Sequence, residues 1–521
     1  MRTKNSIKNI SITIFTQVII TLLGFISRKI FLNILGSEYL GINGFLTNVL
    51  SMLSLVEGGI GTSITYNLYK PLAEDDKKRV IALVQLYKKI YGILGCFIFL
   101  LSLTLYPFLG IFIRDSNDIQ FIGVIYFIFV MKNIISYVNA HKWSLINADQ
   151  KGYVISKYNL MFNIITTISK IIVLITTNSY IIYLIIELSI FIIQNVWNGN
   201  IVNKRYPYIK ERLKYDIDTE TRNNLITNVK ALFLHKVGGY CVFGTDNILI
   251  SSLISIKLVG LYSNYTMIMS QLSSLLNPII NGIGASVGNL IASESKEKSY
   301  DVFQVVYMIN FWIYSFCVIF LFNLIEPFIN WWLGEGLLLG KTTLIIILIN
   351  FYISGMRSSI NTFKEKAGIF KEDKYYPIIE AIINLVVSII LAKKIGIVGI
   401  FLGTTISTIS VPLWKQSKLV YNKVFNKSVI GYFYKYFLYI LLTIVVGVIT
   451  TLICNYIVNT GFISLIIKVI ICVIIPNLIY IVIFFKTKEF KYIVSLIKSV
   501  VNNLKSVYIK QLYKNRSIRD V

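Results

Sequence analysis

The stretch "YGILGCFIFLLSLTLYPFLGIFI", from Tyr91 to Ile113, contains no charged residue. As a helix its 23 residues would extend about 35 Å. The hydrocarbon core of a bilayer is ~30 Å thick, so one such helix is long enough to cross it. A second stretch, "ISLIIKVIICVIIPNLIYIVIFF" from Ile463 to Phe485, has the same length and one charged residue, Lys468. These stretches predict helices that span a membrane.

Composition extends this prediction to the whole chain. Of the 521 residues, 55% are hydrophobic and 15% are charged, and the mean hydropathy is +0.69. A soluble protein of this size would need far more polar surface to cover its core. A membrane β-barrel would show short segments of alternating hydrophobicity instead. The predicted fold class is therefore an all-α polytopic membrane protein.

The apolar blocks predict about fourteen transmembrane helices. Their approximate cores are residues 10–34, 42–66, 82–106, 118–140, 154–176, 179–199, 226–253, 258–290, 302–325, 341–361, 376–394, 396–416, 431–457 and 461–485. The first block is too long for the apolar region of a secretory signal and lacks a small-residue cleavage site, so we interpret it as a retained first helix.

The basic residues lie in alternate connections between these blocks, and they account for the net charge of +26. Connections on one side carry roughly seven times as many Lys and Arg as those on the other, with the pair Lys393 and Lys394 as the main exception. The positive-inside rule then predicts that both termini are cytoplasmic, in a multi-pass protein of the cytoplasmic (inner) cell membrane. Charge placed at helix ends argues against binding of nucleic acid.

An internal repeat relates the two halves of the chain. At an offset of 219 residues, "YLGINGFLTNVLSMLS" (Tyr39 to Ser54) matches "LVGLYSNYTMIMSQLSS" (Leu258 to Ser274), with Gly41 aligned to Gly260. Six spans per copy predict parallel repeats related by an axis along the membrane normal. The expected domains are a six-helix bundle at 1–200, a linker at 201–223, a second bundle at 224–420, two additional helices at 421–486 and a tail at 487–521.

The tail has apolar residues at helical spacing, among them Ile493, Ile497 and Leu504, with lysines between them. This pattern is typical of a basic amphipathic helix on the inner leaflet, although a helix that binds a partner protein has the same signature.

Polar residues interrupt two of the repeat-related spans. In "HKVGGYCVFGTDNILI" (His235 to Ile250), Lys236, Tyr240 and Asn247 share one helix face. At the repeat offset they correspond to Gln17, Thr21 and Arg28, which also share a face. Ionisable residues in mid-membrane usually line a cavity or pair with one another, so two such faces predict a central pathway. The predicted substrate-binding residues of this central cavity are Arg28, Lys236, Gln17, Thr21, Tyr240 and Asn247.

Three further residues are candidates for ion coupling or for tuning the charge of the cavity: Glu57, Asp246 and His235. Each of them, and Arg28 and Lys236 as well, could instead belong to a structural ion pair or lie at the interface. Lys170 and Glu187, on adjacent predicted helices, could simply pair with each other.

The sequence has no constellation typical of catalysis. The five cysteines are scattered, His141 and His235 are isolated, and there is no GxSxG, P-loop or HExxH motif. We therefore expect no enzymatic activity, no cofactor, no metal and no ATP site.

Several blocks resemble the Wzx-type polysaccharide flippases, the oligosaccharide repeat-unit translocases of the MATE-like multidrug/oligosaccharidyl-lipid/polysaccharide exporter superfamily. They are "HKVGGYCVFGTDNILIS" followed by "VGLYSNY", "LGSEYLGINGF" (Leu35 to Phe45), "LVEGGIGTSI" (Leu55 to Ile64), "WWLGEGLLL" (Trp331 to Leu339) and "GIFKEDKYYPIIEAIINL" (Gly368 to Leu385). Together they are most similar to the Gram-positive, capsule-type branch.

This resemblance implies a MATE-like fold and a flippase for undecaprenyl-pyrophosphate-linked oligosaccharides. It implies a basic cavity in which Arg28 and Lys236 face the anionic head group while Asp246 and Glu57 tune charge or couple ions. The implied partners are the lipid-linked oligosaccharide and the membrane, with a polysaccharide polymerase and glycosyltransferases as further candidates.

Three other functions stay open on the sequence. A cation-coupled multidrug antiporter with a MATE-like fold would need an acidic, aromatic cavity, whereas the candidate groups here are mixed to basic. A lipid II-type flippase is a close relative of the favoured function. In a non-transporting scaffold for envelope synthesis, neutralising Arg28 and Lys236 would leave polymer export intact.

Overall fold

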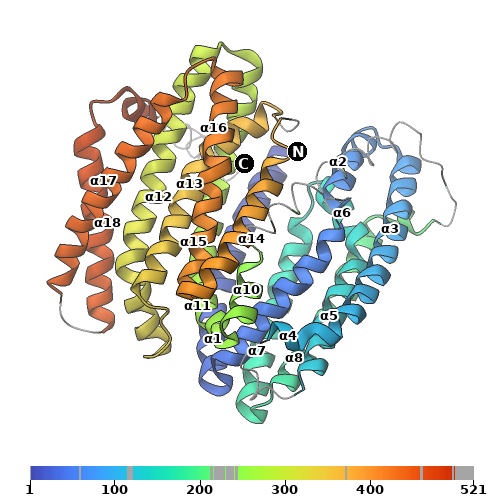
Figure 1. The fold of residues 1–521 in the computed structure, drawn as a ribbon. Coiled ribbons are helices and arrows are strands. Elements are labelled where there is room, and N and C mark those ends of the chain that lie inside the picture. Colours follow the sequence, from blue (N-terminus) through green and yellow to red (C-terminus); the bar gives the residue numbers. More distant parts are fainter. Residues whose placement is uncertain are drawn as a thin grey trace, which may run out of the picture. The chain divides into compact units, whose positions relative to one another are not determined.

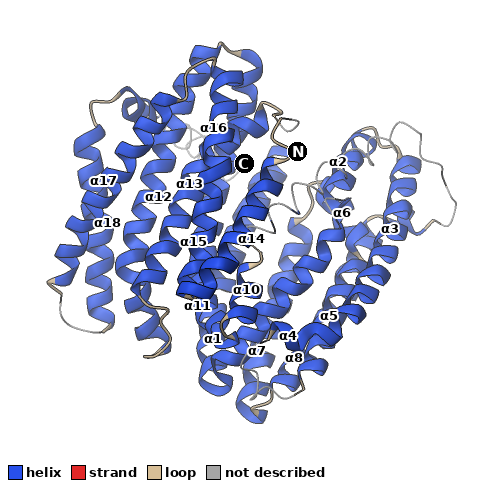
Figure 2. Cartoon of the chain, in the orientation of Figure 1, coloured by secondary structure: helices blue, strands red, loops and turns tan. Residues whose placement is uncertain are grey.

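The computed structural model describes residues 2–57, 60–113, 121–211, 244–369, 372–457 and 461–495, together with the single residues 215, 229, 237, 240 and 498. Every regular element in this described part is a helix, as Figure 2 shows. The helices form two compact units. The first comprises 1–271, 335–339 and 374–408, and the second comprises 272–334, 340–373 and 409–521.

The first unit begins with α1 (Arg2–Leu53), which joins the expected span 10–34 to the first part of the expected span 42–66. The break between them is at Gly36, whose φ of 82° lies in the left-handed region that glycine adopts without steric cost. The helix tightens into a 3-10 turn, η1 (Ser54–Glu57), and α2 (Ile60–Ala73) follows.

The next helices of this unit are long and apolar. They are α3 (Lys77–Leu105), η2 (Tyr106–Phe108), α4 (Leu109–Phe112), α5 (Ile122–Val138), α6 (Ala140–Ala148), α7 (Tyr153–Thr177), α8 (Tyr180–Arg205) and η3 (Pro207–Lys210). The Asp76 side chain caps α3 by accepting from the backbone N–H of Arg79. In Figure 1, α7 lies beside α1 and α8, and α5 lies against both α3 and α8.

Four helices from later in the chain contribute to the same unit. They are α10 (Asp246–Leu253), the first part of α11 (Ile256–Ser293), α14 (Tyr376–Ile395) and α15 (Ile397–Thr408). The helices α14 and α15 pack antiparallel and very close together. Their close approach is evident at Gly403, where an added Cβ would lie 2.0 Å from the Ser388 hydroxyl.

The second unit contains the rest of α11, α12 (Lys296–Leu333), α13 (Lys341–Lys366), η4 (Ile409–Leu413), α16 (Trp414–Val420), η5 (Tyr421–Phe425), α17 (Ile430–Asn455) and α18 (Phe462–Phe484). Its core is aromatic: Phe311 on α12 stacks on Tyr439 of α17 with ring centroids 4.1 Å apart. A buried ion pair joins Lys364 at the end of α13 to Asp373.

Among the described residues, nine helices are long and apolar enough to cross a membrane, and the bent pair α5 and α6 makes a tenth candidate. The chain is thus a multi-pass helical membrane protein. The count of fourteen spans, the cytoplasmic location of both termini and the five-part domain division stay predictions. The expected tail helix beyond Ser495 lies, apart from Lys498, outside the described residues.

Candidate functional site

The first unit contains an antiparallel seam between α1 and α11. Near one end, the amide of Gln17 donates to Oε1 of Gln271 at 2.9 Å, and the hydroxyl of Thr21 donates to the same oxygen at 2.7 Å. One turn further along, a Cβ on Gly24 would lie 3.2 Å from Cε of Met267. The polar face predicted on the first span therefore packs on another helix of the same unit at these positions.

Arg28 lies in the middle of this seam. Its Nη1 donates to Oγ of Ser263 at 2.8 Å and approaches Oδ1 of Asn264 at 3.4 Å. Both partners are neutral, and within the described part of the chain no carboxylate forms an ion pair with the guanidinium. A cation that is partly buried among neutral groups has lost hydration without gaining a counter-charge, which favours binding of an anion.

A cavity of about 380 Å³ opens beside Arg28, between α1, α7, α8 and α11. Lys170 and Glu187 line it as well. The carboxylate of Glu187 accepts from Nζ of Lys170 at 2.5 Å and from Lys132 on α5. The suggested pair of Lys170 with Glu187 is thus confirmed, and Lys132 is a partner that sequence reasoning missed.

The charges around this cavity sum to a positive value. Arg28, Lys170 and Glu187 line the cavity, and Lys132 pairs with Glu187 from α5, so three cations and one carboxylate give a net formal charge of about +2. Nζ of Lys170 also lies 4.4 Å from the ring centroid of Tyr183, a cation–π contact. In the sequence, Lys132 stands out as a lysine within an apolar block. Residue spacing alone does not show that its partner is Glu187.

The seam narrows where the two glycines matched by the repeat meet. A Cβ on Gly41 would lie 2.0 Å from the carbonyl oxygen of Ile256, and one on Gly260 would lie 2.0 Å from that of Ser37. Real Cβ atoms do not approach backbone so closely, so both positions require glycine at this helix spacing. A pseudo-two-fold axis between two repeats brings equivalent residues together at one crossing point. The meeting of Gly41 and Gly260 fits such an axis.

A second pairing joins the end of α1 to residues that precede α10 and to its first turn. Tyr240 donates its hydroxyl to the carbonyl oxygen of Asn48, and the Asn48 amide donates to the carbonyl oxygen of Gly244 at 2.8 Å. Nδ2 of Asn247 lies 3.5 Å from a Cβ built on Gly44. At the repeat offset of 219, Asn247 corresponds to Arg28 and Gly44 to Ser263, so this one contact follows the repeat.

Two of the candidates for charge tuning have contrasting surroundings. Asp246 is buried at the start of α10, and its Oδ1 has no hydrogen-bond partner within the described residues. Glu57 accepts a long hydrogen bond of 3.4 Å from the hydroxyl of Tyr91. Neither residue lines the cavity beside Arg28.

His235 and Lys236 lie outside the described residues, so the predicted juxtaposition of Lys236 with Arg28 stays a prediction. Of the remaining predicted site residues, the structure brings Arg28, Gln17 and Thr21 onto the first seam and places Tyr240 and Asn247 in the second pairing.

The arrangement of the helices matches that of known membrane transporters. The structure of the lipid II flippase MurJ in its inward closed conformation is 14% identical in sequence, aligns over 91% of this chain and 99% of its own, and gives a TM-score of 0.62. The Vibrio cholerae MATE transporter VcmN, in a mutant form, is 14% identical over 82% of this chain and 99% of its own, with a TM-score of 0.55. These similarities establish a shared fold, that of the MATE-like flippases and transporters.

The sequence itself places the chain more narrowly. The family of polysaccharide biosynthesis proteins matches residues 6–283, which is more than half of the chain. The chain belongs to this family of polysaccharide biosynthesis proteins. No curated protein sequence matches it. The resemblance to Wzx-type flippases of the MATE-like superfamily is thus confirmed at the level of family and fold.

Proposed function

We propose that this protein moves undecaprenyl-pyrophosphate-linked oligosaccharide repeat units from the inner to the outer leaflet of the cytoplasmic membrane, by alternating access, for capsule or another surface polysaccharide. Membership in the polysaccharide biosynthesis family supports the saccharide part of this proposal. The fold shared with a lipid flippase and with MATE transporters supports translocation.

The observation that carries the proposal is the charge of Arg28, which no carboxylate among the described residues compensates with an ion pair. Its hydrogen-bond partners are an alcohol and an amide, while the one carboxylate at the cavity already holds Lys132 and Lys170. A diphosphate would supply the missing counter-charge. The forked donors of arginine suit phosphate oxygens, and hydrogen bonds between charged groups are roughly twice as strong as neutral ones.

The size of the cavity limits what it would hold. At about 380 Å³ it is at the small end of the usual range for ligand sites, which begins at ~300 Å³. We assign it to the charged head group and not to a whole oligosaccharide. In this proposal the path of the substrate through the protein is lined by polar side chains that offer hydrogen bonds to sugar hydroxyls, those of Gln17, Thr21, Tyr240 and Asn247. Lys236 adds a second cation to the substrate-binding site.

The sign of the charge disfavours an export cavity for cationic drugs. The net charge of about +2, in which Arg28 is counted, would repel an organic cation from this cavity, and at a few ångströms in a partly dry site this repulsion costs on the order of several kcal/mol. Asp246 and Glu57 lie away from this cavity, and we propose that they tune charge or couple an ion elsewhere on the pathway.

The test is complementation of a strain in which the gene is deleted. Deletion should abolish surface polysaccharide and cause lipid-linked sugar to accumulate on the inner leaflet. Arg28→Gln should fail to restore the polymer, and Arg28→Lys should restore it in part because the charge is kept. The matched control is Lys29→Gln, which removes the same charge from an exposed neighbour on the same helix and should restore the polymer fully.

Other outcomes would contradict the proposal. If Arg28→Gln restores polymer as well as the wild-type gene, Arg28 does not bind the substrate. Unchanged polymer with altered drug sensitivity would indicate a multidrug antiporter. Accumulation of lipid II in place of another lipid-linked sugar would indicate a lipid II-type flippase.

A further inference from the structure

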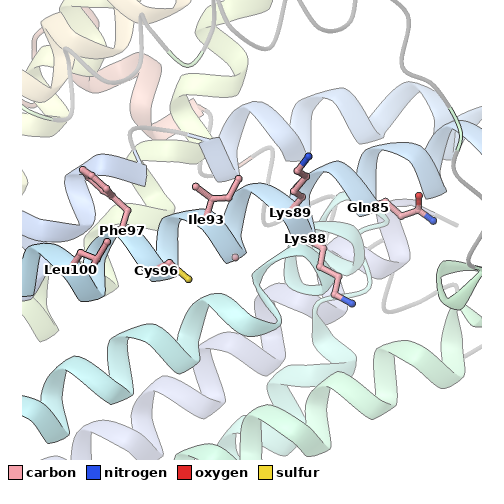
Figure 3. A pocket seen from close by; sticks show the side chains of 8 residues that line it. Gln85, Lys88, Lys89, Ile93, Cys96, Phe97 and Leu100 are labelled. Atoms are coloured by element: carbon pink, nitrogen blue, oxygen red, sulfur yellow. The ribbon is translucent and has the colours of Figure 1, made fainter.

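The exposed face of α3 carries a shallow, open groove, lined by residues of this helix alone, that takes no part in the site described above (Figure 3). The groove has a volume of about 760 Å³. One end has the polar side chains of Gln85, Lys88 and Lys89, and the rest is apolar. The apolar lining consists of Gly92, Ile93, Cys96, Phe97 and Leu100.

The apolar half of this groove follows from helical spacing. Ile93, Phe97 and Leu100 recur at intervals of four and three residues and therefore form one stripe, which is largely exposed. Gly92 provides a notch beside the stripe, because a Cβ built there would meet no atom within 4 Å. From Gly92 to Leu100 the groove extends about 12 Å along the helix.

A second cavity, of about 460 Å³, adjoins the polar end and shares Gln85 and Lys88 with the groove. Lys142 on α6 and Lys210 on η3 also line it, as do His141 and Asn203. The amide of Gln85 donates to the carbonyl oxygen of Glu211 at 3.0 Å and so fixes the chain after η3 at the wall of this cavity.

The charge of this second cavity is positive and largely unpaired. Lys88, Lys142 and Lys210 line it together with one carboxylate, that of Glu211, and none of the three lysines forms an ion pair within the described part of the chain. His141 is 4% exposed, and its Nδ1 has no hydrogen-bond partner among the described residues. A buried ring nitrogen without a partner beside three lysines indicates that a polar ligand completes this site.

The position along the chain places the lysines at the edge of the membrane. The apolar run that follows Lys89 continues from residue 90 to residue 112 and is long enough to cross ~30 Å of hydrocarbon. Lys88 and Lys89 are therefore at the head-group level, on the side that the charge pattern predicts to be cytoplasmic. The apolar stripe faces the region of the acyl chains.

We propose that an anionic glycerophospholipid of this leaflet binds here, with its phosphate among Lys88, Lys142 and Lys210 and one acyl chain in the α3 groove. Charge complementarity selects an anionic head group, since basic pockets at the inner membrane surface attract such lipids. The continuity of the basic cavity with the apolar groove selects a diacyl lipid over a free anion. The site shares no residue with the cavity beside Arg28.

Native mass spectrometry of the purified full-length protein tests this site. Phosphatidylglycerol and phosphatidylcholine with the same acyl chains are added in turn, and the retained lipid is counted. We expect phosphatidylglycerol to be retained at least about tenfold better. The triple variant Lys88→Gln, Lys142→Gln, Lys210→Gln should lose this preference. Its charge-matched control replaces three exposed lysines of the second unit, Lys296, Lys415 and Lys418, with Gln and should keep it.

The variant Gly92→Leu tests the groove separately, without changing charge. The open space at Gly92 accommodates the side chain, so the protein should fold as before while phosphatidylglycerol retention falls several-fold. Equal retention of the two lipids, or unchanged retention in the triple variant, would overturn the proposal. Displacement of phosphatidylglycerol by millimolar inorganic phosphate would overturn it too and would identify a free-anion site. These readouts do not depend on whether oligosaccharide is flipped.

Discussion

The crossing of α1 and α11 at Gly41 and Gly260 predicts a sharp response to a single methyl group. In either Gly41→Ala or Gly260→Ala, the new Cβ would lie 2.0 Å from a backbone carbonyl oxygen of the opposite helix. Neither atom belongs to a flexible side chain, so the helices must move apart by more than about 1 Å to restore an ordinary contact of ~3.3 Å.

The size of the effect follows from two opposing terms. Overpacking of a tight contact costs typically ~1–3 kcal/mol, whereas replacing glycine by alanine inside a helix gains up to ~1 kcal/mol. We expect a net loss of about 1–2 kcal/mol for each variant, which is a fall of a few degrees in the apparent melting temperature of the purified protein in detergent. Because both methyl groups open the same crossing, the double variant should lose less than the sum of the two.

Gly431→Ala on α17 is the matched control. A Cβ at this position meets no atom within 4 Å, so the variant should melt at the wild-type temperature or slightly above it. If Gly41→Ala and Gly260→Ala also melt at the wild-type temperature, the close approach of α1 and α11 is wrong. Destabilisation by one of them alone would contradict the symmetry that the repeat implies.

Three further predictions concern buried polar groups. Glu187→Gln should destabilise the protein by about 3–5 kcal/mol, since it leaves two lysines without their carboxylate, and the added change Lys170→Met should recover part of the loss; thermal unfolding in detergent measures both. Asp373→Asn should cost a similar amount, because it strands the buried Lys364, and reduced yield of folded protein in size-exclusion chromatography would report it. Tyr480→Phe removes the hydroxyl bonded to the buried Ser315 that helps α18 dock on α12, and a loss of about 1 kcal/mol should appear in the same unfolding assay. Wild-type stability in any of these variants would contradict the corresponding buried contact.

Apolar length was sufficient to predict the helices that face lipid on much of their surface. The expected spans 154–176, 431–457 and 461–485 differ by one or two residues at each end from α7 (Tyr153–Thr177), α17 (Ile430–Asn455) and α18 (Phe462–Phe484). The sequence did not predict that α1 continues through Gly36, because a helix that changes direction at a glycine has the same composition as two helices joined by a loop.

The candidate site was predictable in part. The repeat correctly aligned Gly41 with Gly260 and placed Arg28 and Asn247 at equivalent positions, because a repeat preserves contacts at a fixed offset. The partners of Arg28, Ser263 and Asn264, were not predictable, since small polar residues in membrane helices give no sign of which helix they face. Lys132 was missed because its partner, Glu187, is 55 residues away along the chain and lies on another helix.

Binding of undecaprenyl pyrophosphate to the purified protein tests the central claim most directly. A charge-assisted contact at Arg28 is worth about 1.5–3 kcal/mol, so Arg28→Gln should weaken binding by roughly 10- to 100-fold relative to the wild-type protein. Lys29→Gln, with the same loss of charge on an exposed side chain, should bind as the wild-type protein does. Equal affinity of Arg28→Gln and Lys29→Gln for the pyrophosphate lipid would contradict the account.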